Sequence, residues 1–121
     1  MQRRTFRQLR ATAESQFHHH VYVVLLDACA GKLRKAISSN PNRDPRKPSV
    51  YVGMSGLKPE ERFANHKSGI KSARIVQRYG LRLMPELYEI YNPMPFEAAA
   101  NMERELAEDL RAQGYTVFGG T

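Results

Sequence analysis

A long amphipathic segment near the C-terminus limits most strongly what this chain can fold into. Between Phe96 and about Gln113, at about 100° per residue, the apolar side chains form one helical stripe. Its members are Phe96, Ala99, Ala100, Leu106, Ala107 and Leu110. A helix with a single apolar stripe must bury it against another element. We therefore expect this helix, which ends before Gly114, to cover a sheet or other helices.

Two short runs of β-branched and aromatic residues, at 18–27 and 50–54, predict buried strands. Pro59, the acidic pair that follows it and Gly69 predict a helix over 59–68. A second helix is expected over about 70–79 and a third strand over 86–91. The order β-β-α-α-β-α predicts an α/β domain with a small three-stranded mixed sheet flanked by helices. Residues 115–118 could add a short edge strand.

The length of 121 residues fits one domain. We expect a basic N-terminal arm at 1–15 and a domain at 16–121 that carries a basic insertion at about 30–48. Cys29 is the single cysteine, so an intrachain disulfide is impossible, which fits a reducing compartment. No run approaches the roughly 18 apolar residues that span a membrane. The cytoplasm is the expected location, and the sequence does not indicate an oligomeric state.

The net charge of +7 is unevenly distributed along the chain. Residues 1–82 hold 17 Lys/Arg and 5 Asp/Glu, whereas residues 83–121 hold 2 and 7. This asymmetry favours a surface that faces a polyanion, although a plain solvated basic surface is equally compatible. The candidate phosphate contacts are Lys58, Lys67, Lys71, Arg74 and Arg78 around the middle helices and Lys32, Arg34 and Lys35 in the insertion.

Glu103 interrupts the apolar stripe of the last expected helix. It follows Ala99 by four residues and precedes Leu106 by three, and both spacings place side chains on one face. An ionised carboxylate that faces a core is costly unless it is paired or binds a cation. Glu103 is therefore either a member of a buried ion pair, with Arg62 or His66, or a metal ligand or catalytic group.

Four further residues are candidates for the same site, and each also has a purely structural interpretation. Arg62 and His66 are four residues apart on the expected helix over 59–68, and the planar guanidinium of arginine suits a phosphate. A solvated arginine and a rim histidine are the alternative. Tyr22 and Tyr51 each alternate with valines in an expected strand, where tyrosines are usually core residues with a hydrated hydroxyl.

Taken in order, these elements resemble the motifs of the GIY-YIG nuclease family. The similar segments are His20-Val21-Tyr22, Tyr51-Val52-Gly53-Met54-Ser55, Glu61-Arg62-Phe63-Ala64-Asn65-His66 and Glu97-Ala98-Ala99-Ala100-Asn101-Met102-Glu103. The resemblance covers about residues 18–118. The chain departs from the family at His20 and Val21, in the long spacing between its two motif tyrosines, and in lacking a clear asparagine after the last helix.

The resemblance implies a metal-dependent endonuclease acting on DNA in preference to RNA. Glu103 would hold Mg²⁺ (or Mn²⁺), and Arg62 would stabilise charge on the phosphate in the transition state. One tyrosine, with Tyr51 favoured over Tyr22, would activate the attacking water, and His66 would relay a proton or contact phosphate. Two alternatives are a non-catalytic nucleic-acid-binding module and an adaptor whose basic face contacts an acidic protein.

Overall fold

The structure is a computed structural model that describes residues 17–120, so the expected basic arm at 1–15 lies outside the described residues. The elements in chain order are β1 (His20–Leu26), η1 (Ala28–Lys32), α2 (Arg34–Ser39), β2 (Ser49–Ser55), α3 (Pro59–Ser68), α4 (Arg74–Tyr79), β3 (Gly80–Leu83), η2 (Pro85–Leu87), η3 (Glu89–Tyr91), α5 (Phe96–Ala112) and β4 (Thr116–Gly119). The mixture of strands and helices confirms the expected α/β class.

The sheet has four strands in the order β3-β1-β2-β4. β1 is antiparallel to both of its neighbours, and β2 and β4 run parallel, so the sheet is mixed as expected. In the β1–β2 register, Tyr22 lies opposite Gly53 and Val24 lies opposite Tyr51. The two tyrosines are therefore diagonal neighbours on one face of the sheet.

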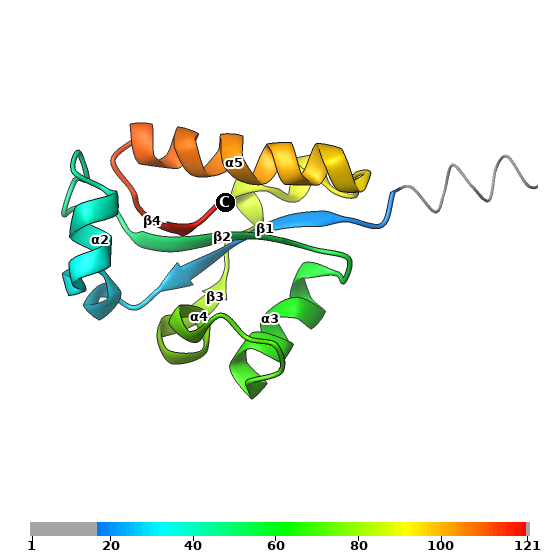
Figure 1. The fold of residues 1–121 in the computed structure, drawn as a ribbon, viewed down its shortest axis with the longest axis horizontal. Helices are drawn as coiled ribbons and strands as arrows, with labels where there is room; N and C mark the ends of the chain where they lie inside the picture. The colour runs from blue at the N-terminus through cyan, green and yellow to red at the C-terminus, as the bar shows by residue number, and fades with distance from the viewer. Residues whose placement is uncertain (1–16, 121) are drawn as a thin grey trace, which may run out of the picture.

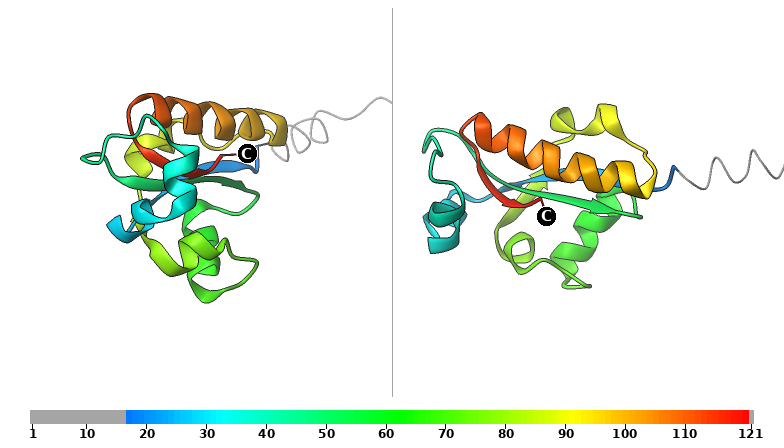
Figure 2. Two further views of the ribbon diagram at one scale, coloured as in Figure 1. Left: turned by 60° about the vertical axis from the view of Figure 1, so that its left-hand side comes forward. Right: turned by 45° about the horizontal axis from the view of Figure 1, so that its top comes forward.

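Helices cover both faces of this sheet. Figure 1 shows α5 along one side and α3 and α4 on the other, and the turned views of Figure 2 keep this arrangement. Burial on both faces explains why β1 reads as a nearly continuous apolar run. Val21, Tyr22, Val23 and Val24 are each at most 1% exposed.

The two longest helices follow their sequence signals. α3 begins at Pro59 and ends at Gly69, which adopts a φ of 81° and so supplies the left-handed end of the helix. α5 buries most of the expected stripe, including Ala99, Leu106, Ala107 and Leu110. Phe96 is the exception: its side chain is 59% exposed because it lies in the first turn, at the margin of the sheet.

The expected three-stranded sheet and its third strand at 86–91 are wrong. The third strand along the chain is β3, which pairs with the edge of β1 away from β2. The segment at 86–91 instead forms most of the short 3-10 turns η2 and η3. The reason lies in Asn92, whose side-chain amide accepts from the Val21 N–H at 2.9 Å and donates to the Val21 carbonyl at 2.7 Å. This one side chain occupies the part of the β1 edge that a strand over 86–91 would have needed. β4 overlaps the segment 115–118 that could add an edge strand, and it is the fourth strand.

The second helix begins later than expected, at Arg74 rather than about residue 70. The carbonyls of Ile70 and Lys71 accept from the guanidinium of Arg62, at 3.4 Å and 2.8 Å, and so do not start a helix. Lys71 also has a φ of 46°, which is incompatible with a right-handed helix. The turn between α3 and α4 is thus held by a side chain of α3.

Residues 30–48, the expected basic insertion, contain the end of η1 and the short helix α2. α2 packs beside β4 at the end of the sheet opposite the start of α5, as Figure 1 shows. In the part of the chain that the structure describes, no helix is long and apolar enough to cross a bilayer.

Candidate active site

Tyr22 of β1 and His66 of α3 form the centre of a buried polar cluster. The Tyr22 hydroxyl lies 2.9 Å from Nε2 of His66, and the two side chains are 1% and 0% exposed. α3 places His66 here because the helix packs against β1 and β3, with His66 among its buried residues. Two residues 44 positions apart in the sequence are thus joined directly.

The proton positions on His66 follow from its second contact. Nδ1 accepts the backbone N–H of Ala73 at 2.9 Å, so Nδ1 carries no proton. Burial, followed by the nearby charge of Arg62, lowers the pKa of His66 from 6.5 to about 4. The ring is therefore neutral at pH 7 with its proton on Nε2, and it donates that proton to the Tyr22 oxygen.

Tyr51 of β2 lies beside this pair. Its ring centroid is 6.3 Å from that of Tyr22 and 5.8 Å from that of His66, the latter in an edge-to-face arrangement. Unlike Tyr22, the Tyr51 side chain is only partly buried. Burial, followed by the charge of Glu103, raises the pKa of Tyr51, and Arg62 opposes this effect.

Gly53 allows the two tyrosines to meet. A Cβ atom at Gly53 would lie 2.6 Å from the Tyr22 hydroxyl and 3.0 Å from the Tyr51 ring, well inside van der Waals contact. The phenol of Tyr22 therefore crosses β2 directly over the Gly53 backbone. Sequence reasoning had quoted Gly53 only as a motif letter; its signal is the Tyr-Val-Gly pattern in a strand, where glycine often marks close approach.

Arg62, one turn before His66 on α3, supplies the positive charge of the cluster. Its guanidinium is half-buried and lowers the pKa of Tyr22, of Tyr51 and of His66. For Tyr22, a hydrogen-bond interaction with the guanidinium adds to this effect. The same guanidinium donates to the turn carbonyls described above, which fixes its position.

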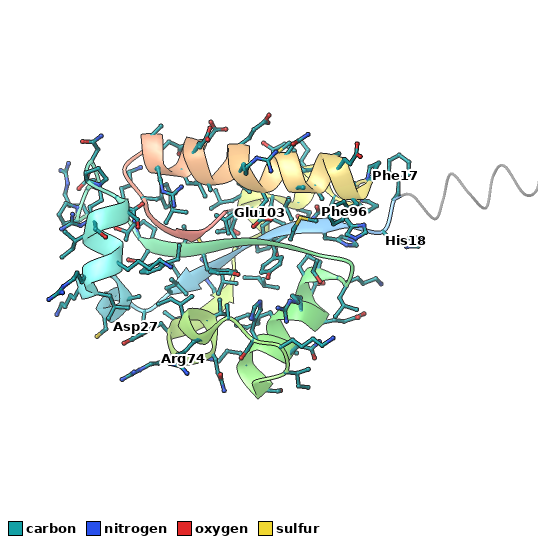
Figure 3. All side chains as sticks on the ribbon, in the orientation of Figure 1. Phe17, His18, Asp27, Arg74, Phe96 and Glu103 are labelled. Atoms are coloured by element: carbon teal, nitrogen blue, oxygen red, sulfur yellow. The ribbon has the colours of Figure 1, made fainter. Side chains whose placement is uncertain are left out.

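Glu103 reaches the cluster from the opposite side of the sheet. Its side chain is 8% exposed and lies on the side of α5 that faces the sheet, as Figure 3 shows. β4 ends here: a Cβ at Gly120 would lie 2.3 Å from Cβ of Ala107 and 3.6 Å from the Glu103 carbonyl oxygen. Since β4 pairs with β2 only as far as Val52, the β2 edge at Gly53 has no β4 partner beside Glu103.

The charge of Glu103 acts on both phenols. The pKa of Tyr22 is raised above its ordinary value, first by burial, then by Tyr51 and by Glu103. Of the five residues expected from the sequence, Tyr22, Tyr51 and His66 are in ring contact. Arg62 interacts with Tyr22, and Glu103 acts on both phenols through its charge.

The donor set at this site suits a hard cation that keeps most of its water. Within residues 17–120, no group of three or more His, Cys, Asp or Glu side chains could hold a metal. Mg²⁺, however, is commonly held by one or two carboxylates together with waters and substrate phosphate. A buried carboxylate beside two phenols, which is the arrangement at Glu103, fits that mode of binding and does not fit a closed structural site.

The candidate phosphate contacts divide into two groups. Lys35, Arg74 and Arg78 line one cleft together with Tyr51, whereas Lys32 and Lys58 line separate clefts. Lys67 is engaged within the fold, because its ammonium donates to the carbonyls of Gln77 and Gly80 at 2.9 Å and 3.0 Å. Arg34 and Lys71 are exposed.

His20, the first residue of the segment His20-Val21-Tyr22, lines a different cleft from Tyr51. It lines a cleft with Lys58, Glu60 and Tyr88 on the α3 and η2 side. Among the described residues, Nδ1 of His20 and the hydroxyl of Tyr88 are buried without a hydrogen-bond partner. The sequence analysis does not single out Tyr88, which lies in the segment that was expected to be a strand.

Comparison with known proteins identifies no relative: no family model, no curated protein and no solved structure matches this chain.

Proposed function

We propose that this chain is a metal-dependent endonuclease that hydrolyses phosphodiester bonds in DNA. One observation carries the proposal: the Tyr22 hydroxyl is hydrogen-bonded to His66 at 2.9 Å beside the Tyr51 ring, and the charges of Arg62 and of the buried Glu103 act on both phenols. A structural ion pair alone would explain a buried Glu103 and Arg62, but it would not require two tyrosines and a neutral histidine around them. The resemblance to the GIY-YIG nucleases supports the same assignment.

In the proposed reaction, Arg62 binds the scissile phosphate and stabilises the negative charge that builds on its oxygens. Mg²⁺ (or Mn²⁺), held by Glu103 with waters, would supply positive charge for the phosphate and the leaving oxygen. Tyr22 and Tyr51 face the attacking water. The charge of Glu103 raises the pKa of both phenols. A cation bound at Glu103 would offset that charge and so oppose this rise in pKa.

The hydrogen bond from His66 favours Tyr22 over Tyr51 as the base, which must first release its phenol proton to solvent and then accepts the proton of the water as the phenolate. A phenolate at Tyr22 would be stabilised by the Nε2 proton of His66 and by the Arg62 guanidinium. His66 already carries its proton on Nε2, so it positions and stabilises the Tyr22 oxygen and does not itself take the proton. We therefore assign Tyr51 to orienting the water and revise the expectation that Tyr51 is the base.

A cleavage assay on labelled DNA in Mg²⁺ or Mn²⁺ tests the proposal. We expect Glu103→Gln and Tyr22→Phe to lower the cleavage rate by about 100-fold or more, with Tyr51→Phe less severe. Arg62→Lys keeps the charge but loses the planar pair of donors, and we expect a similar loss. Glu105→Gln, an exposed carboxylate of α5, is the matched control and should retain activity.

Cleavage that survives Glu103→Gln unchanged would overturn the assigned site. Salt-sensitive DNA binding by the unaltered protein without turnover in either metal would overturn the nuclease and leave a nucleic-acid-binding module. Thermal unfolding of each variant separates a lost reaction from a lost fold, which matters for Arg62 because it also holds the turn between α3 and α4.

A further inference from the structure

A cleft opens directly beside the candidate active site. Its volume is about 540 Å³, which falls within the range of small-molecule sites. Two tyrosines, Tyr51 and Tyr79, and two aliphatic side chains, Leu33 and Ile75, form much of its wall, and each is partly buried. We call it the α4 cleft, because α4 supplies the residues along one side.

The rim of the α4 cleft is cationic. Lys35, Arg74 and Arg78 line it, all three are exposed, and no aspartate or glutamate is among the lining residues. In the described part of the chain, no carboxylate forms an ion pair with any of the three. The guanidinium of Arg78 lies 5.4 Å from the centre of the Tyr79 ring, within cation–π range. Figure 3 shows Arg74 projecting outward from this side of the molecule.

A cleft with an aromatic wall and a cationic rim suits unpaired nucleotides better than an intact duplex. Intact duplex offers phosphates to a protein surface but keeps the faces of its bases stacked, so backbone binding requires cations and no apolar hollow. Unpaired nucleotides offer both a phosphate and an exposed base, and proteins bind them with cationic grooves that contain aromatic side chains. The α4 cleft has both components.

The cleft is continuous with the candidate active site through Tyr51. That ring lines the cleft and also lies near Tyr22 and His66, at centroid separations of 6.3 Å and 5.8 Å. A base held against Tyr51 and Tyr79 would therefore place a neighbouring phosphate at the mouth of the site. A duplex would have to unpair to make the same contact.

We infer that the α4 cleft binds unpaired nucleotides, so that the DNA on which this chain acts carries a single-stranded segment beside the scissile phosphate. This inference rests on the proposed function for its account of cleavage. Binding itself requires neither the metal nor the reaction, so the two can fail separately.

Fluorescence anisotropy in EDTA, which prevents metal-dependent cleavage, measures the affinity of the protein for each DNA probe. The probes are a fluorescein-labelled DNA single strand, a blunt duplex of the same sequence, and that duplex with a single-stranded flap. We expect the single strand and the flapped duplex to bind about 10-fold more tightly than the blunt duplex, because an unpaired base can stack on an aromatic side chain in addition to the phosphate contacts. In Mg²⁺, the flapped duplex should be cut near its junction.

Variants of the cleft should remove the preference. We expect Tyr79→Ala and, independently, Arg78→Ala to reduce the ratio of flap to duplex affinity by about 5-fold or more. Arg78 is exposed, so its replacement keeps the test valid if Tyr79→Ala unfolds the protein. Tyr79→Phe retains the ring and Arg82→Ala removes an exposed cation outside the cleft, and both should keep the preference.

Equal affinity for all three probes, with cleavage in Mg²⁺ intact, would overturn the inference and leave the proposed nuclease standing. Unpaired binding that no cleft variant weakens would also overturn it, because the binding would then lie elsewhere. A flap preference without turnover would support the cleft and contradict the nuclease. Failure to bind any of the probes would contradict both.

Discussion

Gly53 is the residue on which the geometry of the candidate site most depends, although it contributes no chemistry. Its missing side chain is the space through which the Tyr22 phenol crosses β2 to reach His66. The atoms that a Cβ would meet are ring atoms of two partly or fully buried tyrosines, so they cannot simply move into solvent. The glycine therefore determines where the candidate base lies.

We expect Gly53→Ala to destabilise the protein by about 1–3 kcal/mol, the range for overpacking a core. The Tyr22 ring must shift, so the cleavage rate should fall even at temperatures where the variant is folded. Urea denaturation and the cleavage assay measure the two effects. Gly56→Ala is the matched control, because its Cβ would make an ordinary 3.6 Å contact with His19. A Gly53→Ala protein of unchanged stability and activity would contradict this account.

At the scale of elements, Asn40 joins three pieces of the fold. Its buried side-chain amide donates to the carbonyls of Ala36 and Val117 at 2.9 Å and 3.1 Å. Its oxygen accepts from the Val117 N–H at 3.0 Å and from Arg111 at 3.1 Å. One side chain therefore ties α2, β4 and α5 together, and it pairs with both backbone polar groups of Val117 on β4.

We expect Asn40→Ala to lower the free energy of unfolding by about 1–3 kcal/mol, because it leaves buried backbone groups without their partners. β4 should also fray, which hydrogen exchange at the Val117 amide would detect. Asn42→Ala, two residues along the chain and exposed, is the control and should be nearly neutral. Unchanged protection of the Val117 amide from hydrogen exchange in Asn40→Ala would show that the Asn40 side chain does not hold β4 in place.

The elements that sequence reasoning located are those whose signals are local. α3 has Pro59 at its start and Gly69 at its end, and α5 has a stripe that any sheet would bury. The missed elements were decided by distant side chains. Asn92 occupies the β1 edge in place of a third strand at 86–91, and Arg62 takes the carbonyls that a helix from residue 70 would have used.

The candidate site divides in the same way, into residues that local sequence patterns reveal and contacts that depend on distant parts of the chain. Glu103 was recognisable because it breaks a helical stripe, and Arg62 and His66 because they are one turn apart. Their meeting with Tyr22 and Tyr51, the clearance at Gly53 and the direction of the His66 hydrogen bond depend on how the two faces of the sheet are covered. Spacing within one helix or strand carries no information on those distances.

At the scale of the whole molecule, His66 links the candidate site to global stability. In the folded protein, burial and then the charge of Arg62 lower its pKa from 6.5 to about 4, whereas the unfolded chain keeps a value near 6.5. Between these values the unfolded state binds a proton that the folded state does not bind. Stability from this group is therefore complete above pH 6.5 and is lost as the pH falls toward 4.

Within this window, the loss of the His66 contribution should lower the free energy of unfolding by at most about 1.4 kcal/mol for each unit that the pH falls. Tyr22 and Tyr51, which contact the ring, have raised pKa values and do not titrate there. We expect His66→Gln, although less stable at pH 7, to show a shallower dependence of unfolding free energy on pH between 6.5 and 4. Urea denaturation at half-unit steps measures it, with exposed His18→Gln retaining the original slope. Parallel curves for the unaltered protein and His66→Gln would mean that folding does not lower the pKa of His66, and would contradict this account.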